Sequence, residues 1–415
     1  MARILAYTTP AAGHLFPLVP GLLALQRRGH HVHLRVGERL LSVARDAGLD
    51  ASAADPAIDA DEVKDYTAAK DIDKLRKGLH DMLARGPLEK ADLERAIAER
   101  EPDLIITDTN AHGAAVAAQA SGRAWAVSLP SLVPLPGKGI PPYGLGMAPM
   151  GGPLGALRDS VLWKLIERQY AKAMLPRLNA LRASAGLPAL RSPIDHVVAP
   201  DRLLVSTGEP LEYSRTDLPE NVRMVGPQLW DPPAGDAPAW LDEPGDPWVL
   251  VTTSTEYQAD EQLARVAVEA LRDEPVRVLL TLADAYDSAG VPPARNVRVE
   301  RFVPHAPVLE RAAAVVSHSG MGIVQKAMAA GVPIAAVPFG RDQPAVARRV
   351  VEAGAGARLR VKDLTPERLR TTVREALAMR PGAEAAGTRL REAGGPERFA
   401  DAAEELVEAR VAAAA

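Results

Sequence analysis

The pattern that most constrains the fold is a unit that recurs along the chain: a short apolar run, a turn of small residues and a helix-like segment. It first appears where residues 3–8 lead through a turn at 9–14 into a helical stretch at 17–28. It restarts at residue 248, beyond a segment at 219–247 that holds seven prolines. Such alternation is typical of parallel strands with crossover helices. We therefore predict an α/β fold with two Rossmann-like parallel-sheet domains that face across a cleft.

The proline-rich segment gives the predicted domain boundaries. Residues 1–218 form the first domain, residues 219–247 the linker and residues 248–395 the second domain. Residues 396–415 are rich in Ala and Glu and are predicted to form a C-terminal helix.

Composition excludes several classes of protein. The 415 residues include 47% hydrophobic and 25% charged residues and carry a net charge of −4, so no general attraction to nucleic acid is expected. There is no cysteine, which excludes disulfides, thiolate catalysis and cysteine–zinc sites and fits a cytoplasmic location. No uninterrupted apolar run reaches the roughly 18 residues of a membrane span, and prolines interrupt the apolar stretch at 4–25.

A turn at residues 318–322 is a candidate anion site. It follows an apolar run at 314–317 and leads into a helical segment at 323–330. Free N–H groups and the positive end of a helix dipole both face such a turn, and Gly320 and Gly322 would let a phosphate approach. The alternative interpretation is an ordinary strand–helix turn, because a lone Gly-x-Gly is a weak motif.

Two titratable side chains follow predicted strands of the first domain. His14 lies in the turn after the first strand, and Asp108 stands at the end of the apolar run 104–107. Ligands of open parallel sheets bind beyond the carboxyl ends of the strands, so both side chains are candidates for a site there. Each could instead serve as the cap of the helix that follows it.

Four segments together resemble a known signature. They are Phe-Val-Pro at 302–304, Ser-His-Ser-Gly-Met-Gly at 317–322, Ala-Gly-Val-Pro at 330–333 and Pro-Phe-Gly-Arg-Asp-Gln at 338–343. This combination is similar to the donor-sugar signature of inverting two-Rossmann-domain (GT-B) glycosyltransferases, especially actinobacterial enzymes that glycosylate macrolide, enediyne and polyketide natural products. The resemblance implies transfer of a sugar from a nucleoside diphosphate sugar to a hydroxyl or amine of a hydrophobic small molecule, without cofactor or metal.

The resemblance also implies roles for individual residues. His14 would be the general base, and Asp108 would fix its tautomer and stabilise the imidazolium. The first domain would bind the acceptor, the second would bind the nucleotide sugar, and the C-terminal helix would pack back on the first domain. The nucleotide would be bound by Ser254, Thr255, Phe302, Val303, His318, Ser319, Gly320, Met321, Gly322 and Ile323, and the donor sugar by Gly13, Asp342 and Gln343.

Three positions depart from the family pattern. Ile323 replaces a Ser or Thr, Ser254 replaces a Gly, and Lys326 stands where uridine-nucleotide users carry a Glu that binds both ribose hydroxyls. Because deoxyribose lacks the 2′-hydroxyl, Lys326 favours dTDP over UDP as the carrier. The alternative is that Lys326 is only an exposed helix residue.

The acceptor pocket is expected to draw on residues 50–86 and on the loop at 134–153. That loop contains Met147 and Met150 and suits an adaptable apolar pocket or, equally, a plain surface loop. The sequence names neither the sugar nor the acceptor, and it leaves a homodimer open.

Other functions were weighed against this one. A nucleotide-sugar 2-epimerase and a catalytically silent nucleotide-sugar-binding partner protein share the expected fold. Metal sites at His30, His31 and His33, or at the pairs Asp59/Asp61 and Asp71/Asp73, are not expected, because these residues lie at a helix–strand junction and in solvated acidic stretches.

Overall fold

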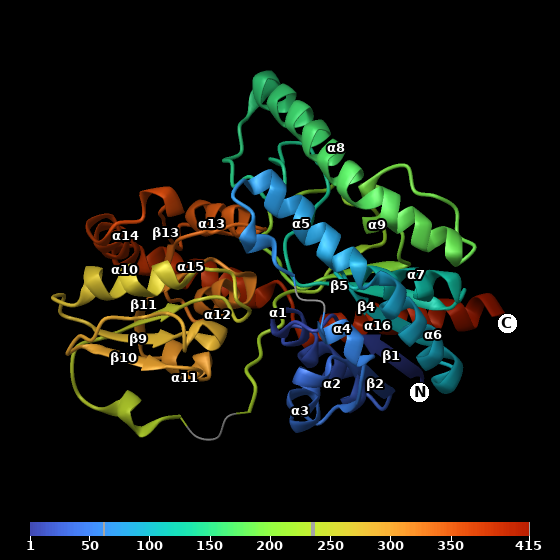
Figure 1. Ribbon diagram of the computed structural model, residues 1–415, viewed down its shortest axis with the longest axis horizontal. Helices are drawn as coiled ribbons and strands as arrows, with labels where there is room; N and C mark the ends of the chain where they lie inside the picture. Colours follow the sequence, from blue (N-terminus) through green and yellow to red (C-terminus); the bar gives the residue numbers. More distant parts are fainter. Residues whose placement is uncertain (61–62, 234–236, 415) are drawn as a thin grey trace.

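The computed structural model describes residues 1–60, 63–233 and 237–414. Its two halves each contain one parallel sheet covered by helices (Figure 1). The first sheet has seven strands in the order β3-β2-β1-β4-β5-β6-β7, and the second has six in the order β10-β9-β8-β11-β12-β13. The predicted α/β class and the two Rossmann-like sheets are confirmed.

The strands of the first sheet are β1 Arg3–Tyr7, β2 His31–Val36, β3 Asp50–Ala53, β4 Leu104–Asp108, β5 Ala124–Leu129, β6 Arg202–Val205 and β7 Val222–Met224. The helices of this half are α1 Ala12–Leu15, α2 Val19–Arg27, α3 Glu38–Asp46, α4 Pro56–Ala60, α5 Asp71–Ala84, α6 Gly86–Arg100, α7 His112–Ala120, α8 Gly152–Ser184 and α9 Pro193–Val197, with a short 3₁₀ helix η1 at Asp65–Thr67.

The strands of the second sheet are β8 Trp248–Thr252, β9 Arg277–Thr281, β10 Val297–Glu300, β11 Ala312–Ser317, β12 Ile334–Ala336 and β13 Gly356–Arg358. The later helices are α10 Glu261–Leu271, α11 His305–Leu309, α12 Met321–Ala329, α13 Gln343–Glu352, α14 Pro366–Ala378, α15 Arg380–Glu392 and α16 Pro396–Ala414, with 3₁₀ turns η2 Ala239–Asp242, η3 Ala283–Ala285 and η4 Val361–Asp363.

Strand order places one switch point in each sheet. The order reverses between β1 and β4 in the first sheet, where Ile4 is paired with Leu104, and between β8 and β11 in the second, where Leu250 is paired with Val315. At such a point the loops that leave the two strands diverge to opposite faces, so a crevice opens beyond their carboxyl ends. His14 and Asp108 follow or end the strands at the first switch point, and His318 follows the strand at the second.

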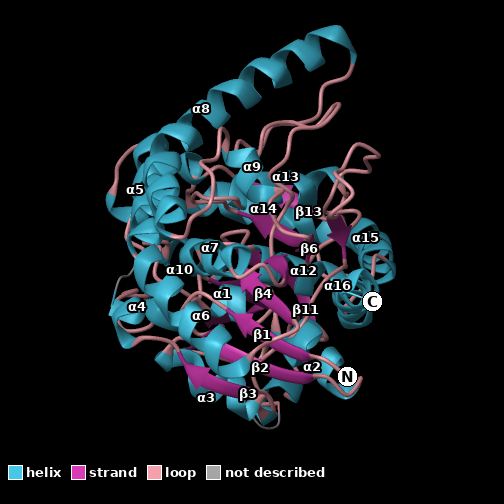
Figure 2. Ribbon diagram, turned by 90° about the vertical axis from the view of Figure 1, so that its right-hand side faces the viewer, coloured by secondary structure: helices cyan, strands magenta, loops and turns pink. Residues whose placement is uncertain are grey.

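Alternating side chains divide the first sheet between two cores. In β1, Ile4 and Ala6 pack in one core with residues of α2, α3 and α16. Leu5 and Tyr7 pack in the other core with residues of α4, α6 and α7. This period of two is expected of a strand buried on both faces. Helices therefore cover both faces of the first sheet (Figure 2).

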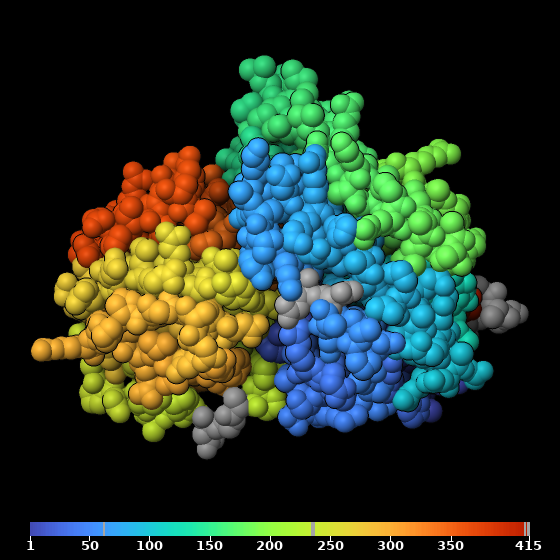
Figure 3. All heavy atoms as spheres, in the orientation of Figure 1, coloured from blue at the N-terminus to red at the C-terminus, as the bar shows by residue number. Residues whose placement is uncertain are grey.

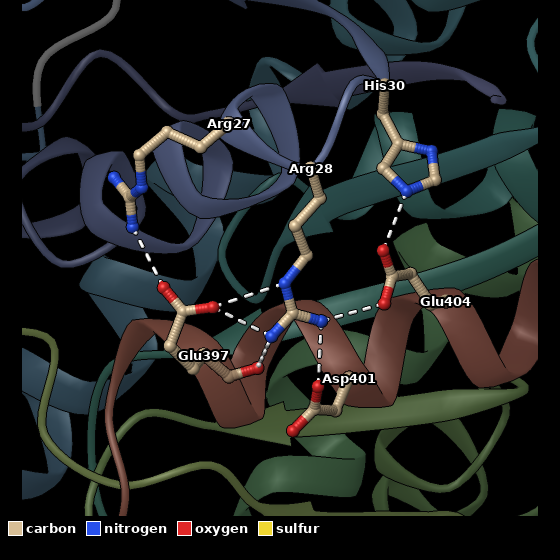
Figure 4. Close-up of polar contacts among 6 residues, drawn as sticks. All are labelled: Arg27, Arg28, His30, Glu397, Asp401 and Glu404. Atoms are coloured by element: carbon tan, nitrogen blue, oxygen red, sulfur yellow. Dashed lines mark hydrogen bonds and ion pairs between the residues drawn. The ribbon is translucent and has the colours of Figure 1, made fainter.

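The C-terminal helix α16 crosses back and lies on the first half, beside α2 (Figures 1 and 4). Phe399 is fully buried there, and a Cβ at Gly21 would lie 2.4 Å from its ring, so only glycine fits opposite it.

Ion pairs fix the register of α16 along α2. The guanidinium of Arg28 donates to the carboxylates of Glu397, Asp401 and Glu404, which lie on one face of α16 (Figure 4). Arg27 also donates to Glu397, at 3.0 Å. The guanidinium of arginine has several N–H donors in a fixed arrangement, so it can bind carboxylates on successive turns of one helix. The single ammonium of lysine does this less well.

The proline-rich linker is shorter than the predicted 219–247. Val222–Met224 forms β7 and pairs in parallel with β6, with Leu203 opposite Val222. Pro219 and Pro227 flank this short edge strand and do not interrupt its hydrogen bonds, so proline density alone set the boundary too early. The strand β3 was also missed, because its sequence Asp-Ala-Ser-Ala has little apolar character.

The longest helix, α8, spans 33 residues, and its first half projects from the body of the protein (Figure 2). Neither α8 nor any other helix within the described ranges combines the length and apolar character that crossing a membrane requires.

Candidate active site

A cleft with a volume of about 1230 Å³ lies between the two halves of the protein. The first half contributes His14 and Asp108 to its lining, and the second half contributes His318 and Asp342. The carboxyl ends of β1, β4, β8 and β11 thus open into one space. This is the arrangement that the two switch points predict.

At the first switch point, His14 and Asp108 form a hydrogen-bonded pair. The Nδ1 atom of His14 lies 2.7 Å from Oδ2 of Asp108. His14 sits within the four-residue helix α1, whose N-cap is Ala11, and the N-cap of α7 is Ala111. Neither His14 nor Asp108 is therefore a helix cap, and the alternative interpretation of both residues is wrong.

Asn110 completes this pair and was not predicted from the sequence. Its backbone N–H donates to Oδ1 of Asp108 at 2.8 Å, and its side-chain Nδ2 lies 3.1 Å from Nε2 of His14. Nδ1 of His14 therefore donates to Asp108, and Nε2 is the ring nitrogen left to accept a proton. A polar residue two positions after a strand-end aspartate was the only available sequence signal.

The environment of His14 favours the charged form of its ring. Burial lowers the pKa of His14, but the charge of Asp108 and the hydrogen bond to it outweigh burial, and Glu256 and Asp342 add to their effect. The pKa of His14 therefore lies above its usual value of 6.5. A raised pKa makes the neutral ring a stronger base.

The turn after β11, where an anion site is predicted, lies in the lining of the cleft. His318, Gly320, Met321, Gly322 and Ile323 line the cleft. A Cβ at Gly320 would lie 2.4 Å from Nε2 of His318, so glycine is required for the imidazole to lie over this turn. Around Gly322 a Cβ would meet nothing within 4 Å, which leaves open space at the N-terminus of α12. Burial lowers the pKa of His318, so its ring is neutral near neutral pH.

Two of the predicted nucleotide residues do not line the cleft. Ser319 has a φ of 70° and is fully buried, so its side chain points away from the cleft. Val303 is buried in the core of the second half. Its neighbour Phe302 lines the cleft and is 45% exposed, so its ring is accessible from the cleft.

Ser254 lines the cleft, but both of its donors are occupied. Its N–H and its hydroxyl both donate to Oδ2 of Asp260, at 2.7 and 2.8 Å. Asp260 therefore holds this turn in place, and the contact of Ser254 with the nucleotide stays a prediction. Thr255 is exposed and lines the cleft beside it.

The predicted sugar-binding residues converge on the cleft, where Gly13, Asp342 and Gln343 all lie in the lining. Ser131 of the first half donates from its hydroxyl to Asp342. The Oε1 atom of Gln343 accepts from the N–H groups of Phe339 and Gly340, and its Nε2 donates to Gln258. The side chain of Gln343 therefore holds the loop at 339–343 through hydrogen bonds within the loop and one to Gln258.

Lys326 is not an exposed helix residue. Its Nζ lies 2.5 Å from Oδ1 of Asp231, and its side chain is only 15% exposed. The other carboxylate oxygen of Asp231 accepts from the N–H of Ala306 at 3.0 Å. Lys326 and Asp231 both line the cleft. The partner lies 95 positions away, so no local pattern indicates the pair.

The part of the cleft nearest α5 and α8 is mainly apolar. Its lining includes Leu75, Leu79, Met82, Trp163, Ile166 and Met174. The loop at 134–153 contributes Pro134, Tyr143, Gly144 and Leu145, whereas Met147 and Met150 are outside the lining. The loop therefore lines the cleft without its methionines, and its part in binding an acceptor stays a prediction.

The candidate metal clusters are engaged elsewhere. His30 lies 2.8 Å from Glu404 of α16, and His33 lies between Asp50 and Ser52. Asp61 lies outside the described residues, and its predicted partner Asp59 accepts from the N–H of Glu38. Within the described ranges, no group of three or more His, Asp or Glu side chains is arranged to hold a metal ion.

Comparison with known proteins identifies the class that this fold and cleft define. Residues 266–408 match the family described as erythromycin biosynthesis protein CIII-like, C-terminal domain. The structure is similar to that of the calicheamicin glycosyltransferase, with a TM-score of 0.74 at 22% identity over 98% of both chains. It is also similar to the glycosyltransferase VinC in complex with dTDP, with a TM-score of 0.70 at 23% identity over 98% of both chains. The fold is thus GT-B.

The family follows from sequence. The chain is 31% identical to 4′-demethylrebeccamycin synthase of Lentzea aerocolonigenes, over 91% of this chain and 92% of that protein. The protein belongs to this family of GT-B glycosyltransferases, whose relatives are named for natural-product pathways of actinobacteria. The predicted resemblance and the predicted enzyme class are confirmed.

Proposed function

We propose that this glycosyltransferase is an inverting enzyme that moves a sugar from a nucleoside diphosphate sugar to a hydroxyl or amine of a hydrophobic small molecule. The observation that carries the proposal is the 2.7 Å contact between His14 and Asp108 at the floor of a cleft shared by both halves. The relatives named for natural-product glycosylation support the nature of the acceptor.

His14 acts as the general base. Its Nε2 takes the proton from the acceptor O–H or N–H as the acceptor attacks the anomeric carbon. The bond from that carbon to the diphosphate oxygen breaks on the opposite face, so the configuration inverts. Asp108 stabilises the imidazolium that results. Asn110, which occupies Nε2 in this structure, gives way to the acceptor group.

The diphosphate is stabilised at the N-terminus of α12. Free N–H groups, the positive end of the helix dipole and the His318 ring face the open space beside Gly322. These donors supply the charge stabilisation without a metal ion. Phe302 stacks on the nucleobase, and Asp342 and Gln343 bind hydroxyls of the sugar.

The carrier is dTDP in preference to UDP. A ribose 2′-hydroxyl is best bound by a free carboxylate, whereas the carboxylate nearest Lys326, that of Asp231, is fixed by hydrogen bonds from Lys326 and Ala306. A deoxyribose makes no such demand. The related glycosyltransferase VinC, whose structure holds dTDP, supports this choice.

The test incubates the protein with dTDP-glucose and with UDP-glucose, each with and without a mixed panel of polyketide, macrolide and indole aglycones. Mass spectrometry detects new glycosides and free nucleotide diphosphate. Glycosides of inverted anomeric configuration are expected only with an aglycone present. Nucleotide release and epimerised sugar without any aglycone would indicate a 2-epimerase, and nucleotide binding without turnover would indicate a silent partner protein.

A further inference from the structure

An ion pair bridges the cleft and has no part in the chemistry above. Arg341 donates from Nε to Oδ2 of Asp65 at 2.9 Å and from Nη2 to Oδ1 at 2.8 Å. Asp65 begins η1 in the first half, 276 positions before Arg341. Two parallel hydrogen bonds between a guanidinium and a carboxylate fix orientation as well as distance.

The pair is largely removed from water. The side chain of Asp65 is 12% exposed and that of Arg341 is 32% exposed. Burial lowers the pKa of Arg341, but the hydrogen bonds and charge of Asp65 reverse that effect, so the guanidinium stays charged. Solvent and salt screen such a pair less than an exposed one, and removing one partner leaves a poorly solvated charge behind.

A second contact joins η1 to the loop between β8 and α10. Tyr66 packs edge-to-face on Tyr257, with ring centroids 5.1 Å apart. Tyr257 belongs to the loop between β8 and α10, and the neighbouring Gln258 accepts from Gln343 at 2.9 Å. The residues of η1 therefore touch both loops of the second half that surround the proposed sugar position.

The backbone of Arg341 needs support from its surroundings. Its φ of 57° lies in the left-handed region, which is disfavoured for any residue other than glycine. Such a conformation persists only where surrounding contacts hold it. It occurs directly before Asp342 and Gln343, so the conformation of Arg341 affects how those two side chains face the cleft, together with their hydrogen bonds to Ser131 and Gln258.

On the other side, Asp65 is coupled to the wall of the acceptor region. The helix α5 follows η1, packs against it and lines the cleft with Leu75, Leu79 and Met82. Gly78 of α5 lies over Asp65, because a Cβ there would be 3.4 Å from the Cβ of Asp65. Figure 3 shows the α5 segment lying against the second half of the molecule. A molecule that binds against α5 therefore affects the position of Asp65.

We propose that Asp65 and Arg341 are positioning residues that couple the acceptor wall to the donor-sugar loop. The pair holds residues 339–343 so that Asp342 and Gln343 face the sugar, and an acceptor seated against α5 stabilises the same arrangement. Coupling of this kind is reciprocal, so each substrate tightens binding of the other by the same factor. This inference rests on the proposed function, because it assigns the loop to the donor sugar.

The first test is independent of any ligand. Hydrogen exchange is measured by mass spectrometry on the full chain, comparing wild type with Asp65→Asn. The control is Asp287→Asn, which breaks an exposed ion pair to Arg301 within the second half. In Asp65→Asn the amides of residues 339–343 are expected to exchange about fivefold faster or more, while residues 318–322 and the control keep wild-type rates. Wild-type exchange at 339–343 would overturn the inference.

The second test separates the sugar loop from the phosphate turn. Calorimetry measures binding of thymidine diphosphate and of thymidine diphosphate glucose. Asp65→Asn is expected to weaken binding of the sugar nucleotide about tenfold and that of the bare nucleotide less than about twofold. Equal weakening of both would indicate general structural damage and would overturn the positioning role.

A second, more conservative variant keeps the inference testable if Asp65→Asn does not fold. Arg341→Lys keeps the charge but loses the two-pronged geometry, so we expect a smaller but clear loss for the sugar nucleotide alone. Wild-type affinity for both ligands in Arg341→Lys would contradict the positioning role. If the wild-type protein binds neither nucleotide, the proposed function fails, and the exchange measurement still decides whether the pair holds the loop.

Discussion

The Nδ1 atom of His14 lies 2.7 Å from Oδ2 of Asp108, although the two residues are 94 positions apart in the sequence. They meet because β1 and β4 are adjacent parallel strands whose carboxyl ends lie together. The contact fixes the tautomer, since a nitrogen that donates to a carboxylate must carry the proton. The lone pair of Nε2 faces the cleft and accepts from Nδ2 of Asn110 in this structure, so it can accept a proton once an acceptor group replaces Asn110, as a general base must.

Replacing His14 by Ala should reduce turnover by about two to four orders of magnitude, which is the usual worth of a general base. Nucleotide binding should persist, because the turn at 318–322 lies in the other half of the cleft. Steady-state kinetics with calorimetry of thymidine diphosphate measures both quantities. His31→Ala, on the exposed start of β2, is the matched control and should behave as wild type. Near-normal turnover without His14 would remove the base from the mechanism.

Asp108→Asn should lower turnover and shift the acid limb of the pH–rate profile to lower pH. The pKa of His14 is raised by Asp108 against the effect of burial, so neutralising Asp108 lowers that pKa. Because the neutral ring is the active form, the rate is lost as pH falls through the pKa, and a lower pKa moves that loss to lower pH. The measurement is kcat/KM against pH for both proteins. An unchanged acid limb would mean that the carboxylate does not tune the base.

Much of this arrangement was predictable because it depends on local pattern. Apolar runs followed by small residues gave the strands whose ends carry His14 and Asp108, and parallel strands bring their carboxyl ends together whatever lies between them. The same reasoning placed His318 and Gly320 at a helix N-terminus. The errors in local structure occurred where pattern is weak, as in the polar strand β3 and the short edge strand β7.

The remaining contacts depend on tertiary geometry that no pattern encodes. Ser254 is closed off by Asp260 of the next helix, and Lys326 is paired with Asp231 of the linker. Arg341 reaches Asp65 across the cleft. Each of these partners is a charged residue among many in the sequence. Only the relative placement of the sheets and loops selects which carboxylate meets which donor.

The proposed preference for dTDP should be weakened by placing a free carboxylate at position 326. Lys326→Glu combined with Asp231→Asn removes the ion pair and supplies an acceptor for the ribose hydroxyls without placing two like charges together. We expect the ratio of UDP to dTDP affinity to rise by about tenfold, or about 1.4 kcal/mol. Calorimetry measures both ligands, and Asp231→Asn alone is the control. A wild-type protein that binds UDP tenfold tighter than dTDP would refute the proposed role of Lys326.

Turnover should be unaffected by excess EDTA. The proposed stabilisation of the diphosphate comes from backbone N–H groups and the helix dipole at α12, which need no ion to act. Activity is compared after exhaustive chelation, with and without added magnesium or manganese. Loss of activity that either ion restores would contradict the proposed leaving-group stabilisation and would point to a metal bridging the phosphates.

The last prediction concerns a buried carboxylate behind the site. Glu89 of α6 is fully buried, its Oε2 accepts from the N–H of Gly113 at 2.9 Å, and its Oε1 has no hydrogen-bond partner in the structure. Burial raises the pKa of Glu89 to about 7, against the opposing effect of Arg85. The folded protein therefore holds a proton that the unfolded chain releases near its usual value of 4.5. The stabilisation from Glu89 is fully present below its usual pKa of 4.5 and is lost as the pH rises through about 7.

Glu89→Gln removes this ionisation. The free energy of unfolding of the variant, relative to that of wild type, should therefore increase as the pH rises from 5 to 8. The maximum difference in the free energy of unfolding is on the order of 3 kcal/mol. Urea unfolding of both proteins across this range gives the difference, from which the buried histidines His112 and His196 cancel because both proteins contain them. Glu99→Gln, an exposed position on the same helix, should show no such trend. A difference that stays flat with pH, or that is larger at pH 5 than at pH 8, would show that Glu89 is already ionised at low pH.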